Sequence, residues 1–380
     1  MLTNRSIYEG RLQELDSLKG IGAIVIAFFF HYKDFWCGGE TNLFYQVPVL
    51  WNLAMHGQWF VELFFMLSGF TTSLSWNRKK LETGGGSFSR YFLKRVFRIY
   101  PSMLVAIVLA YSSQWTIRLL TGETWISGGL SLLNLYYALL GIERWIQCND
   151  PVIPALWFIG PLMACSILFF ILANAQRSKA IFAAPVLLGA FLSGTEWTFA
   201  FFNQRMGRGL FSFFLGVLLC IAMEAMENNR NRNALERFIC FAMLFWLAFV
   251  WMICGLNLYA VKRFQAPVGI LGDYRLFLSL AVFPCVIYLA VKWNPLHWLL
   301  CRSGLVVLGK LSFGIYLWHE PVYYWIQIAR IKAGCLKDTT TVGFFALAAI
   351  LVLTTATVSY CFLEKPAGAY LEKKILRAVK

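Results

Sequence analysis

The sequence predicts an all-α polytopic membrane protein that forms one integral membrane domain over residues 1–380. Its composition is 59% hydrophobic and 17% aromatic but only 14% charged, whereas a soluble protein of this length needs a far more charged surface. Apolar stretches of about 20 residues, the length that a helix needs to cross a bilayer, recur along the chain. The net charge of +15 gathers between these stretches, which is typical of the cytoplasmic ends of membrane helices rather than of nucleic-acid binding.

About ten stretches qualify as transmembrane helices, and we expect both termini to be cytoplasmic because most of the 34 basic residues then fall on the inner side. A further apolar segment, near 127–142, is shorter than the roughly 20 residues of a span. If it crossed the membrane, the basic clusters after it would move outside, so we expect a short re-entrant or outward-lying helix there. The ten expected spans lie near 19–36, 57–76, 93–112, 154–173, 180–200, 207–224, 238–256, 274–292, 304–328 and 341–363.

The cysteines and histidines show no spacing typical of a metal site. Most of the ten cysteines fall within spans, where they act as small apolar residues. Cys37, Cys148 and Cys335 lie in predicted outer loops, and a disulfide between two of them is an open alternative. The four histidines lie far apart in the chain, so we expect no bound metal.

His31 is the first candidate for chemistry, because it lies inside the first apolar span. No ionisable group occurs from Gly20 to Phe30, so a helix would carry His31 roughly 18 Å along its axis from Lys19. Ionisable side chains at such depth are costly and usually line a cavity or pathway. The alternative is a neutral histidine that hydrogen-bonds a neighbouring helix.

Glu62 lies near the outer end of the second span, which runs back inward and brings it level with His31. A carboxylate at this depth would hold the imidazole in one tautomer and raise its basicity. Alternatively, Glu62 is simply protonated in the membrane. His319 and Glu320, followed by Pro321, lie far along the predicted outward-running ninth span. They either line the same cavity as His31 or belong to an aromatic belt at the outer surface.

A basic junction precedes the third span, from Ser87 to Pro101. Lys94, Arg95 and Arg98 lie in the first turns of the predicted helix, and the two arginines share one face. A helix N-terminus with two guanidinium groups suits a phosphate or pyrophosphate, as in coenzyme A. The alternative is an anchor that reaches lipid headgroups on the cytoplasmic side.

Five separated patches resemble the acyltransferase 3 family of integral membrane acyltransferases, whose bacterial members include O-acetyltransferases of cell-surface polysaccharides. The patches extend from Leu15 to Ala367 and are LDSLKGIGA leading to His31, FVELFFMLSGF, RVFRIYP, GKLSFGIYLWHEPV and FLEKPA. The resemblance implies a ten-helix membrane domain and an acyl-CoA donor. It also implies an essential histidine at His31 and an arginine pair at Arg95 and Arg98.

Two departures from the family pattern matter. Eleven residues separate Lys19 from His31, one more than is common in the family, and one residue turns a helix by about 100°. We therefore expect either a wide turn before His31 or a role for His31 that is independent of Lys19. Many members also carry an acidic pair after the tryptophan equivalent to Trp157, where Leu162 and Met163 stand here. This substitution makes Glu62 our predicted partner of His31.

The resemblance implies a bacterial cytoplasmic-membrane enzyme that moves acetyl from acetyl-CoA to a hydroxyl of a cell-surface glycan or its lipid-linked oligosaccharide precursor. His31 would be the catalytic base, oriented by Glu62, and an acyl-histidine intermediate is an alternative. A succinyltransferase, or a flippase of a glycolipid, are the alternative functions. The residues expected to bind the donor are Lys94, Arg95 and Arg98; those expected to contact the acceptor are Trp157, Tyr316, Trp318 and His319; those with an uncertain or structural role are Asp16, Lys19, Glu320 and Glu364.

Overall fold

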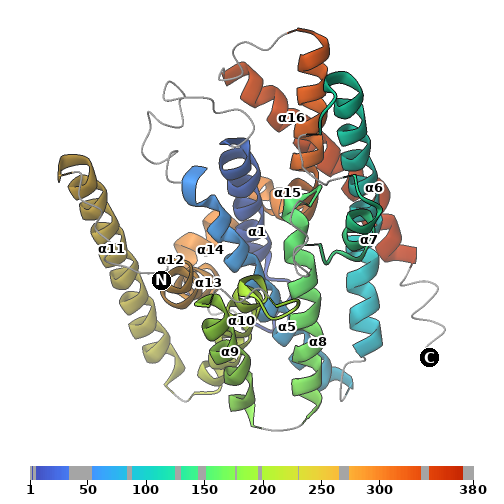
Figure 1. The fold of residues 1–380 in the computed structure, drawn as a ribbon. Helices are drawn as coiled ribbons and strands as arrows, with labels where there is room; N and C mark the ends of the chain where they lie inside the picture. Colours follow the sequence, from blue (N-terminus) through green and yellow to red (C-terminus); the bar gives the residue numbers. More distant parts are fainter. Residues whose placement is uncertain are drawn as a thin grey trace.

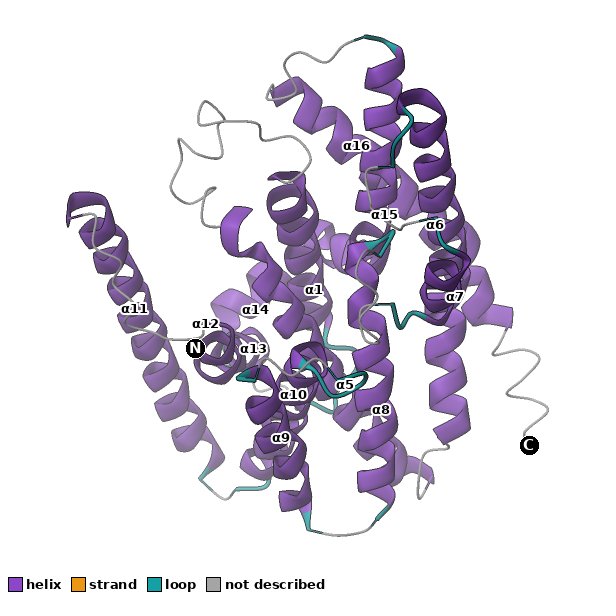
Figure 2. Cartoon of the chain, viewed as in Figure 1, coloured by secondary structure: helices purple, strands orange, loops and turns teal. Residues whose placement is uncertain are grey.

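The structure, a computed structural model, is built from helices and connecting loops (Figures 1 and 2). No strand element occurs in the part of the chain that it describes, apart from an isolated bridge between Leu2 and Trp293. The described residues are 2, 6–33, 54–83, 88–124, 130–143, 151–175, 178–195, 199–229, 231–264, 274–334 and 342–370. Within these ranges the predicted all-α class is confirmed.

The helices follow the predicted spans in order along the chain. Three of them continue into or contain a π-helical turn, at Ile26–His31, Leu278–Val282 and Tyr360–Glu364. Short 3₁₀ turns occur at Gly57–Trp59, Pro154–Phe158 and Lys179–Phe182. The α-helices are α1 (Gln13–Val25), α5 (Phe60–Thr83), α6 (Phe88–Thr121), α7 (Leu132–Leu140), α8 (Ile159–Asn174), α9 (Ala183–Ser193), α10 (Gln204–Glu227), α11 (Arg232–Phe264), α12 (Tyr274–Phe277), α13 (Phe283–Lys292), α14 (Asn294–Leu300), α15 (Ser303–Lys332) and α16 (Val342–Ser359).

Helices α1 and α15 form one of the two closest helix pairs, and glycines make the approach possible. A Cβ atom on Gly20 would lie 2.7 Å from the nitrogen of Gly309, and one on Gly309 would lie 2.3 Å from the backbone of Asp16. Real Cβ atoms do not come this close to backbone, so only glycine allows the contact. In membrane proteins, small residues of this kind let helix backbones pack directly against each other.

The second close pair is α5 with α10. A Cβ on Gly69 would lie 1.9 Å from the carbonyl oxygen of Phe213, and one on Gly216 would lie 2.0 Å from that of Met66. Helix α10 also packs along α9 on its other side. Helix α5 also packs against α1, and the buried apolar residues of the described helices form two clusters.

The wide turn expected before His31 is present. Residues Ile26–His31 continue α1 as a π-helix, whose larger loop accommodates one extra residue without breaking the helix. The hydroxyl of Tyr323, on α15, donates a hydrogen bond of 2.9 Å to the carbonyl oxygen of Ala27 inside this turn. The neighbouring helix thus stabilises the π turn directly.

A buried ion network ties the N-terminal segment to the helices that follow α9. The Nζ atom of Lys292 lies 2.9 Å from a carboxylate oxygen of Glu227 and 2.9 Å from one of Glu236. Glu227 also accepts hydrogen bonds from the backbone of Ile7 and the hydroxyl of Ser6. Lys292 is only 1% exposed, and Arg232 pairs with the same two carboxylates, so two cations balance two buried anions.

The structure supports a multi-pass membrane protein. A helix lies at each of the ten predicted positions, and among the described residues six helical segments are long and apolar enough to cross a membrane. The bent pair α14 and α15 makes a seventh if it is one span. Ten spans and cytoplasmic termini therefore stay predictions. Helix α7 has nine residues, too few to cross a bilayer.

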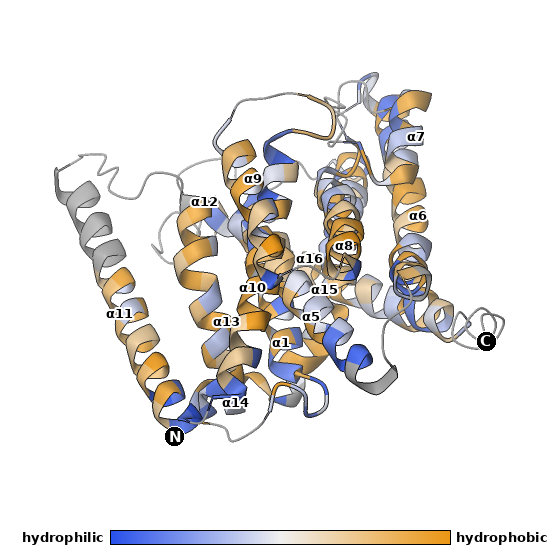
Figure 3. Ribbon diagram, turned by 90° about the horizontal axis from the view of Figure 1, so that it is seen from below, coloured by the Kyte–Doolittle hydropathy of each residue, from blue (hydrophilic) through white to orange (hydrophobic). Residues whose placement is uncertain are grey.

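Apolar side chains also cover the outside of the molecule. Along α11, the rings of Phe238, Phe241, Phe245 and Trp251 are between 71% and 81% exposed, and Figure 3 shows the coloured part of this helix as largely hydrophobic. Such a surface is unfavourable in water but suits contact with lipid chains.

The three cysteines considered for a disulfide, Cys37, Cys148 and Cys335, lie outside the described residues.

Candidate active site

Three side chains from two helices meet at the end of the π turn. The Nδ1 atom of His31 lies 2.6 Å from the Nε2 atom of His319 and 3.5 Å from a carboxylate oxygen of Glu320. The two imidazole centroids are 4.8 Å apart and the ring planes differ by 20°. With such a short N–N distance, the rings must lie edge to edge and share a hydrogen bond.

The hydrogen bonds determine where the protons of this pair lie. The Nδ1 atom of His319 is 3.2 Å from the carbonyl oxygen of Ile315, and because a carbonyl only accepts, this nitrogen carries the proton. The Nε2 atom of neutral His319 is then the acceptor, so the Nδ1 atom of His31 donates to it. The lone pair of His31 consequently lies on Nε2. His319 and Glu320 are thus the groups that orient His31.

Side chains of helix α15 fix this arrangement by hydrogen bonds to the backbone of the segment before α8. The second carboxylate oxygen of Glu320 accepts a 3.2 Å hydrogen bond from the backbone N–H of Ala155, while the hydroxyl of Tyr316 donates to the carbonyl of the same residue at 2.8 Å. One turn further on, Tyr324 donates to the carbonyl of Val152. Both His319 and Glu320 are buried, so their positions are fixed by these contacts.

The predicted pairing of Glu62 with His31 is wrong. A carboxylate oxygen of Glu62 lies 2.5 Å from the Nε atom of Arg208 on α10, and its contacts within the described residues are with this arginine. The guanidinium of Arg208 also stacks over the ring of Trp157, 4.6 Å from its centroid. The physical reason is that a buried carboxylate is stabilised far more by a guanidinium than by a neutral imidazole.

Aromatic rings connect this ion pair to the histidines. Tyr316 lies 5.8 Å from Phe64 and 5.9 Å from Phe158, and its ring is 6.2 Å from that of His319, all measured between centroids. Tyr316 is also within electrostatic range of Glu62, Arg208 and Glu320. A series of contacts therefore connects Trp157, Tyr316 and His319, all predicted to contact the acceptor, and ends at His31.

The basic residues predicted to bind the donor lie on α6. Arg95 donates to the hydroxyls of Tyr91 and Ser166, which fix its guanidinium, whereas Arg98 and Lys94 are exposed. Lys19, on α1, is within electrostatic range of both arginines. The three cations Lys19, Arg95 and Arg98 thus form a positive cluster, about 18 Å along α1 from His31.

The remaining predicted residues are placed as follows. Trp318 is 3% exposed and stands two residues from both Tyr316 and Glu320, or about 200° around the helix from each, so it does not share their face. Asp16 pairs with Arg11 and Lys19 in its own segment, and Glu364 lies near Arg98.

Sequence analysis did not identify Arg208. It lies within α10, one of the helices apolar enough to cross a membrane, and an arginine in such a helix normally requires a partner. The sequence therefore could have indicated that Arg208 needs a buried partner. It could not show that this partner is Glu62, because the rotation of α5 relative to α10 depends on how their glycines pack.

The distances among His31, His319 and Glu320 differ from those of a metal site. His31, His319 and Glu320 offer ligand atoms within 4.8 Å of one another. Two nitrogens that bind one tetrahedral ion, however, are about 3.3 Å apart or more. The N–N distance of 2.6 Å instead indicates a direct hydrogen bond.

Comparison with known protein families matches residues 12–363 to the acyltransferase domain named Acyl_transf_3. The match covers nearly the whole chain and includes His31, the arginine pair and the His319–Glu320 motif. The chain belongs to the acyltransferase 3 family. Comparison with curated proteins and with solved structures gave no match.

The family assignment makes the protein an acyltransferase, as the five sequence patches indicated, and a membrane enzyme rather than a flippase. The matched range includes the buried polar residues just described, and we expect the reacting groups of the acyltransferase to lie among them.

The buried pair of Glu62 and Arg208 gives a first prediction. Replacement of Arg208 by alanine leaves an unbalanced carboxylate that is 1% exposed, and we expect the free energy of unfolding to fall by about 3–5 kcal/mol. Replacement of both Glu62 and Arg208 should lower the free energy of unfolding by less than replacement of Arg208 alone. Thermal unfolding of the detergent-solubilised acyltransferase measures both changes.

Arg237→Ala is the matched control, because Arg237 is exposed on α11 and donates only to its own helix at Asn233. Its unfolding midpoint should equal that of the wild type. An Arg208→Ala variant as stable as this control would show that the ion pair is not a structural element.

Proposed function

We propose that this acyltransferase moves an acetyl group from acetyl-CoA to a hydroxyl of a cell-surface polysaccharide or of its lipid-linked precursor, in the bacterial cytoplasmic membrane. One observation carries the proposal: the hydrogen bond from His31 to His319, with Glu320 beside it, leaves the lone pair of His31 on Nε2. A positioned imidazole of this kind is suited to take a proton from a hydroxyl.

The reaction follows from this arrangement. As the acceptor oxygen attacks the thioester carbonyl, Nε2 of His31 takes its proton, and a positive charge develops on the imidazole. The carboxylate of Glu320, 3.5 Å from Nδ1, stabilises that charge, as acidic groups do beside catalytic histidines. When the C–S bond breaks, the CoA thiolate recovers the proton. In the covalent alternative the same Nε2 atom would carry the acyl group.

The positive cluster of Lys19, Arg95 and Arg98 supports CoA as the donor. CoA carries a pyrophosphate and a 3′-phosphate, and guanidinium groups bind phosphates through paired, charge-assisted hydrogen bonds. Arg98 and Lys94 are exposed and therefore accessible to a ligand from the aqueous phase. Arg95 is oriented by its hydrogen bonds to the hydroxyls of Tyr91 and Ser166. An extended pantetheine arm would then reach along α1 toward His31.

The pair of Glu62 and Arg208 supports a polar acceptor. Within the described residues, Oε2 of Glu62 and Nη2 of Arg208 are buried without a hydrogen-bond partner, although buried polar atoms normally have one. Both are suited to hydroxyl groups, and the indole of Trp157 beside them offers a flat face for a sugar ring. A glycan hydroxyl held there would lie on the same side as His31.

Replacement of His31 by alanine removes the proposed base, so the rate of acyl transfer should fall by about 10²–10⁴-fold. The protein should remain in the membrane at its normal level, because His31 makes its polar contacts at one end of α1. Release of free CoA thiol from acetyl-CoA, in membranes supplied with native glycan, measures the rate.

His56→Ala serves as the control, since His56 is an exposed histidine that stacks on Trp59 and lies outside the triad. We expect it to retain the wild-type rate. Full activity in the His31→Ala variant would overturn the proposal, whichever acyl donor is used.

The donor site is tested separately with Arg98→Ala. Loss of one charge-assisted hydrogen bond is worth about 1.5–3 kcal/mol, so affinity for CoA should fall about ten- to hundredfold. Arg237→Ala, on the distant α11, should bind CoA as the wild type does. Isothermal titration of CoA into purified protein measures the affinities, and equal affinity in both variants would favour a lipid-headgroup anchor instead.

A further inference from the structure

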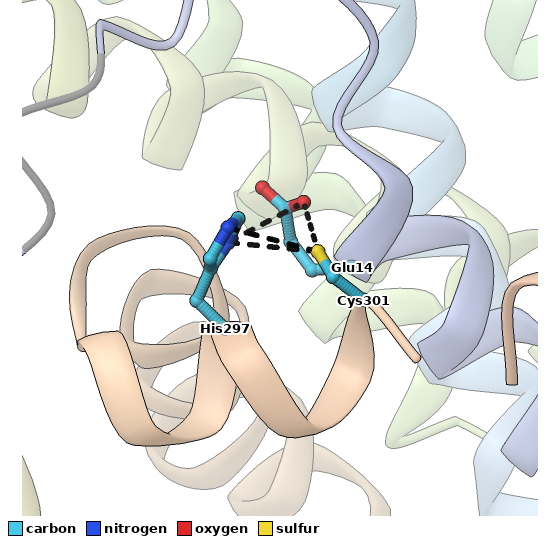
Figure 4. Close-up of side chains that lie close together, drawn as sticks. All are labelled: Glu14, His297 and Cys301. Carbon is cyan, nitrogen blue, oxygen red and sulfur yellow. Dashed lines mark hydrogen bonds and ion pairs between the residues drawn. The ribbon is translucent and has the colours of Figure 1, made fainter. Parts of the chain in front are cut away.

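A second cluster of ligand-type side chains lies at the start of α1, far from the candidate active site. Figure 4 shows Glu14 of α1 facing His297 of α14 and Cys301, which directly follows α14. The sulfur of Cys301 is 3.6 Å from Oε2 of Glu14 and 3.8 Å from Nδ1 of His297, and the same Nδ1 atom is 3.7 Å from the same carboxylate oxygen. Each residue thus offers one ligand atom close to those of the other two.

The two sulfur separations are within the range of weak S–H hydrogen bonds, but the separation between His297 and Glu14 suits a shared ion better than a direct contact. A nitrogen and an oxygen 3.7 Å apart are beyond hydrogen-bond distance. Around a tetrahedral zinc ion with bonds of about 2.0–2.3 Å, neighbouring ligand atoms lie about 3.3–3.6 Å apart. The three separations through Nδ1, at 3.6, 3.7 and 3.8 Å, lie at or slightly beyond the upper end of this range, in contrast to the 2.6 Å distance within the histidine pair.

The local fold explains why these residues meet. His297 and Cys301 are four residues apart, which places them on one face at the end of α14. The hydroxyl of Ser17 donates a 2.6 Å hydrogen bond to the carbonyl of Leu300, so α1 is fixed against this turn. Glu14 is fully buried while the side chain of His297 is 23% exposed, which gives an ion a path from solvent.

We propose that Glu14, His297 and Cys301 bind a divalent transition-metal ion of the zinc class. A thiolate, an imidazole and a carboxylate together favour zinc over magnesium or calcium. A water molecule on the His297 side completes the tetrahedron. The site lies 17 residues before His31, or about 25 Å along the helix, so the ion does not take part in acyl transfer.

The role of this ion is to fix α1 relative to the junction between α14 and α15. Those two helices meet at an angle of 64°, and α15 carries His319. Bound metal would link the first residues of α1 to the start of α15, and a ligand that binds only the folded state raises its stability. The thermal midpoint should therefore rise when zinc is added.

The experiment uses the purified full chain in detergent, treated with a chelator and then titrated with cobalt(II) chloride. Cobalt bound by a thiolate gives a charge-transfer absorption band, so the band reports ligation by cysteine directly. We expect one cobalt ion per chain, displaced by zinc chloride, with the band kept in Cys361→Ala and lost in Cys301→Ala. Cys361 is an exposed cysteine outside the cluster and serves as the matched control.

His297→Gln provides a second variant, because it removes the ligand whose side chain is partly exposed and leaves the buried Glu14 in place. It should weaken cobalt binding by at least about tenfold, since the ion loses one of three protein ligands. No charge-transfer band in the wild type, a band that survives in Cys301→Ala, or unchanged affinity in His297→Gln would each overturn the proposal. None of these readouts depends on acyl transfer.

Discussion

The register between α1 and α15 is the constraint on which the site depends. The two helices touch where Gly20 meets Gly309, and from there His319 is ten residues along α15 while His31 is eleven residues along α1. Two regular helices would not bring these positions together, because the extra residue rotates His31 by about 100°. The π turn at Ile26–His31 absorbs that residue, and the hydroxyl of Tyr323 holds it in place.

The polar groups around α1 and α15 lie in separate layers. The histidine pair with Glu320 lies at one level, the ion pair of Glu62 and Arg208 lies nearby on the far side of Tyr316, and the cations around Arg95 lie toward the start of α1. Burial of a charge is costly unless it is paired. The carboxylate of Glu62 is balanced by Arg208, whereas Arg98 is exposed to solvent.

Much of this could be predicted from the sequence, because it depends on local pattern. Apolar stretches located the helices, and the spacing of Lys19 and His31, compared with that of the resembled family, made a wide turn one of two expected outcomes. The partner of His31 could not be predicted, since Glu62 and Glu320 lie at similar depths in the sequence pattern. Only the packing of glycines in α1, α5, α10 and α15 decides how each helix is rotated, and these contacts are tertiary.

Nitrogen-15 magnetic resonance of the histidines shows directly which ring nitrogen of His31 carries the proton and whether it is shared with His319. The chain has only four histidines, and substitution of His56 and His297 leaves the two of interest. The account predicts a proton on Nδ1 of His31, with a coupling across the hydrogen bond to Nε2 of His319. A proton on Nε2 of His31 instead, or no coupling between the two rings, would contradict it.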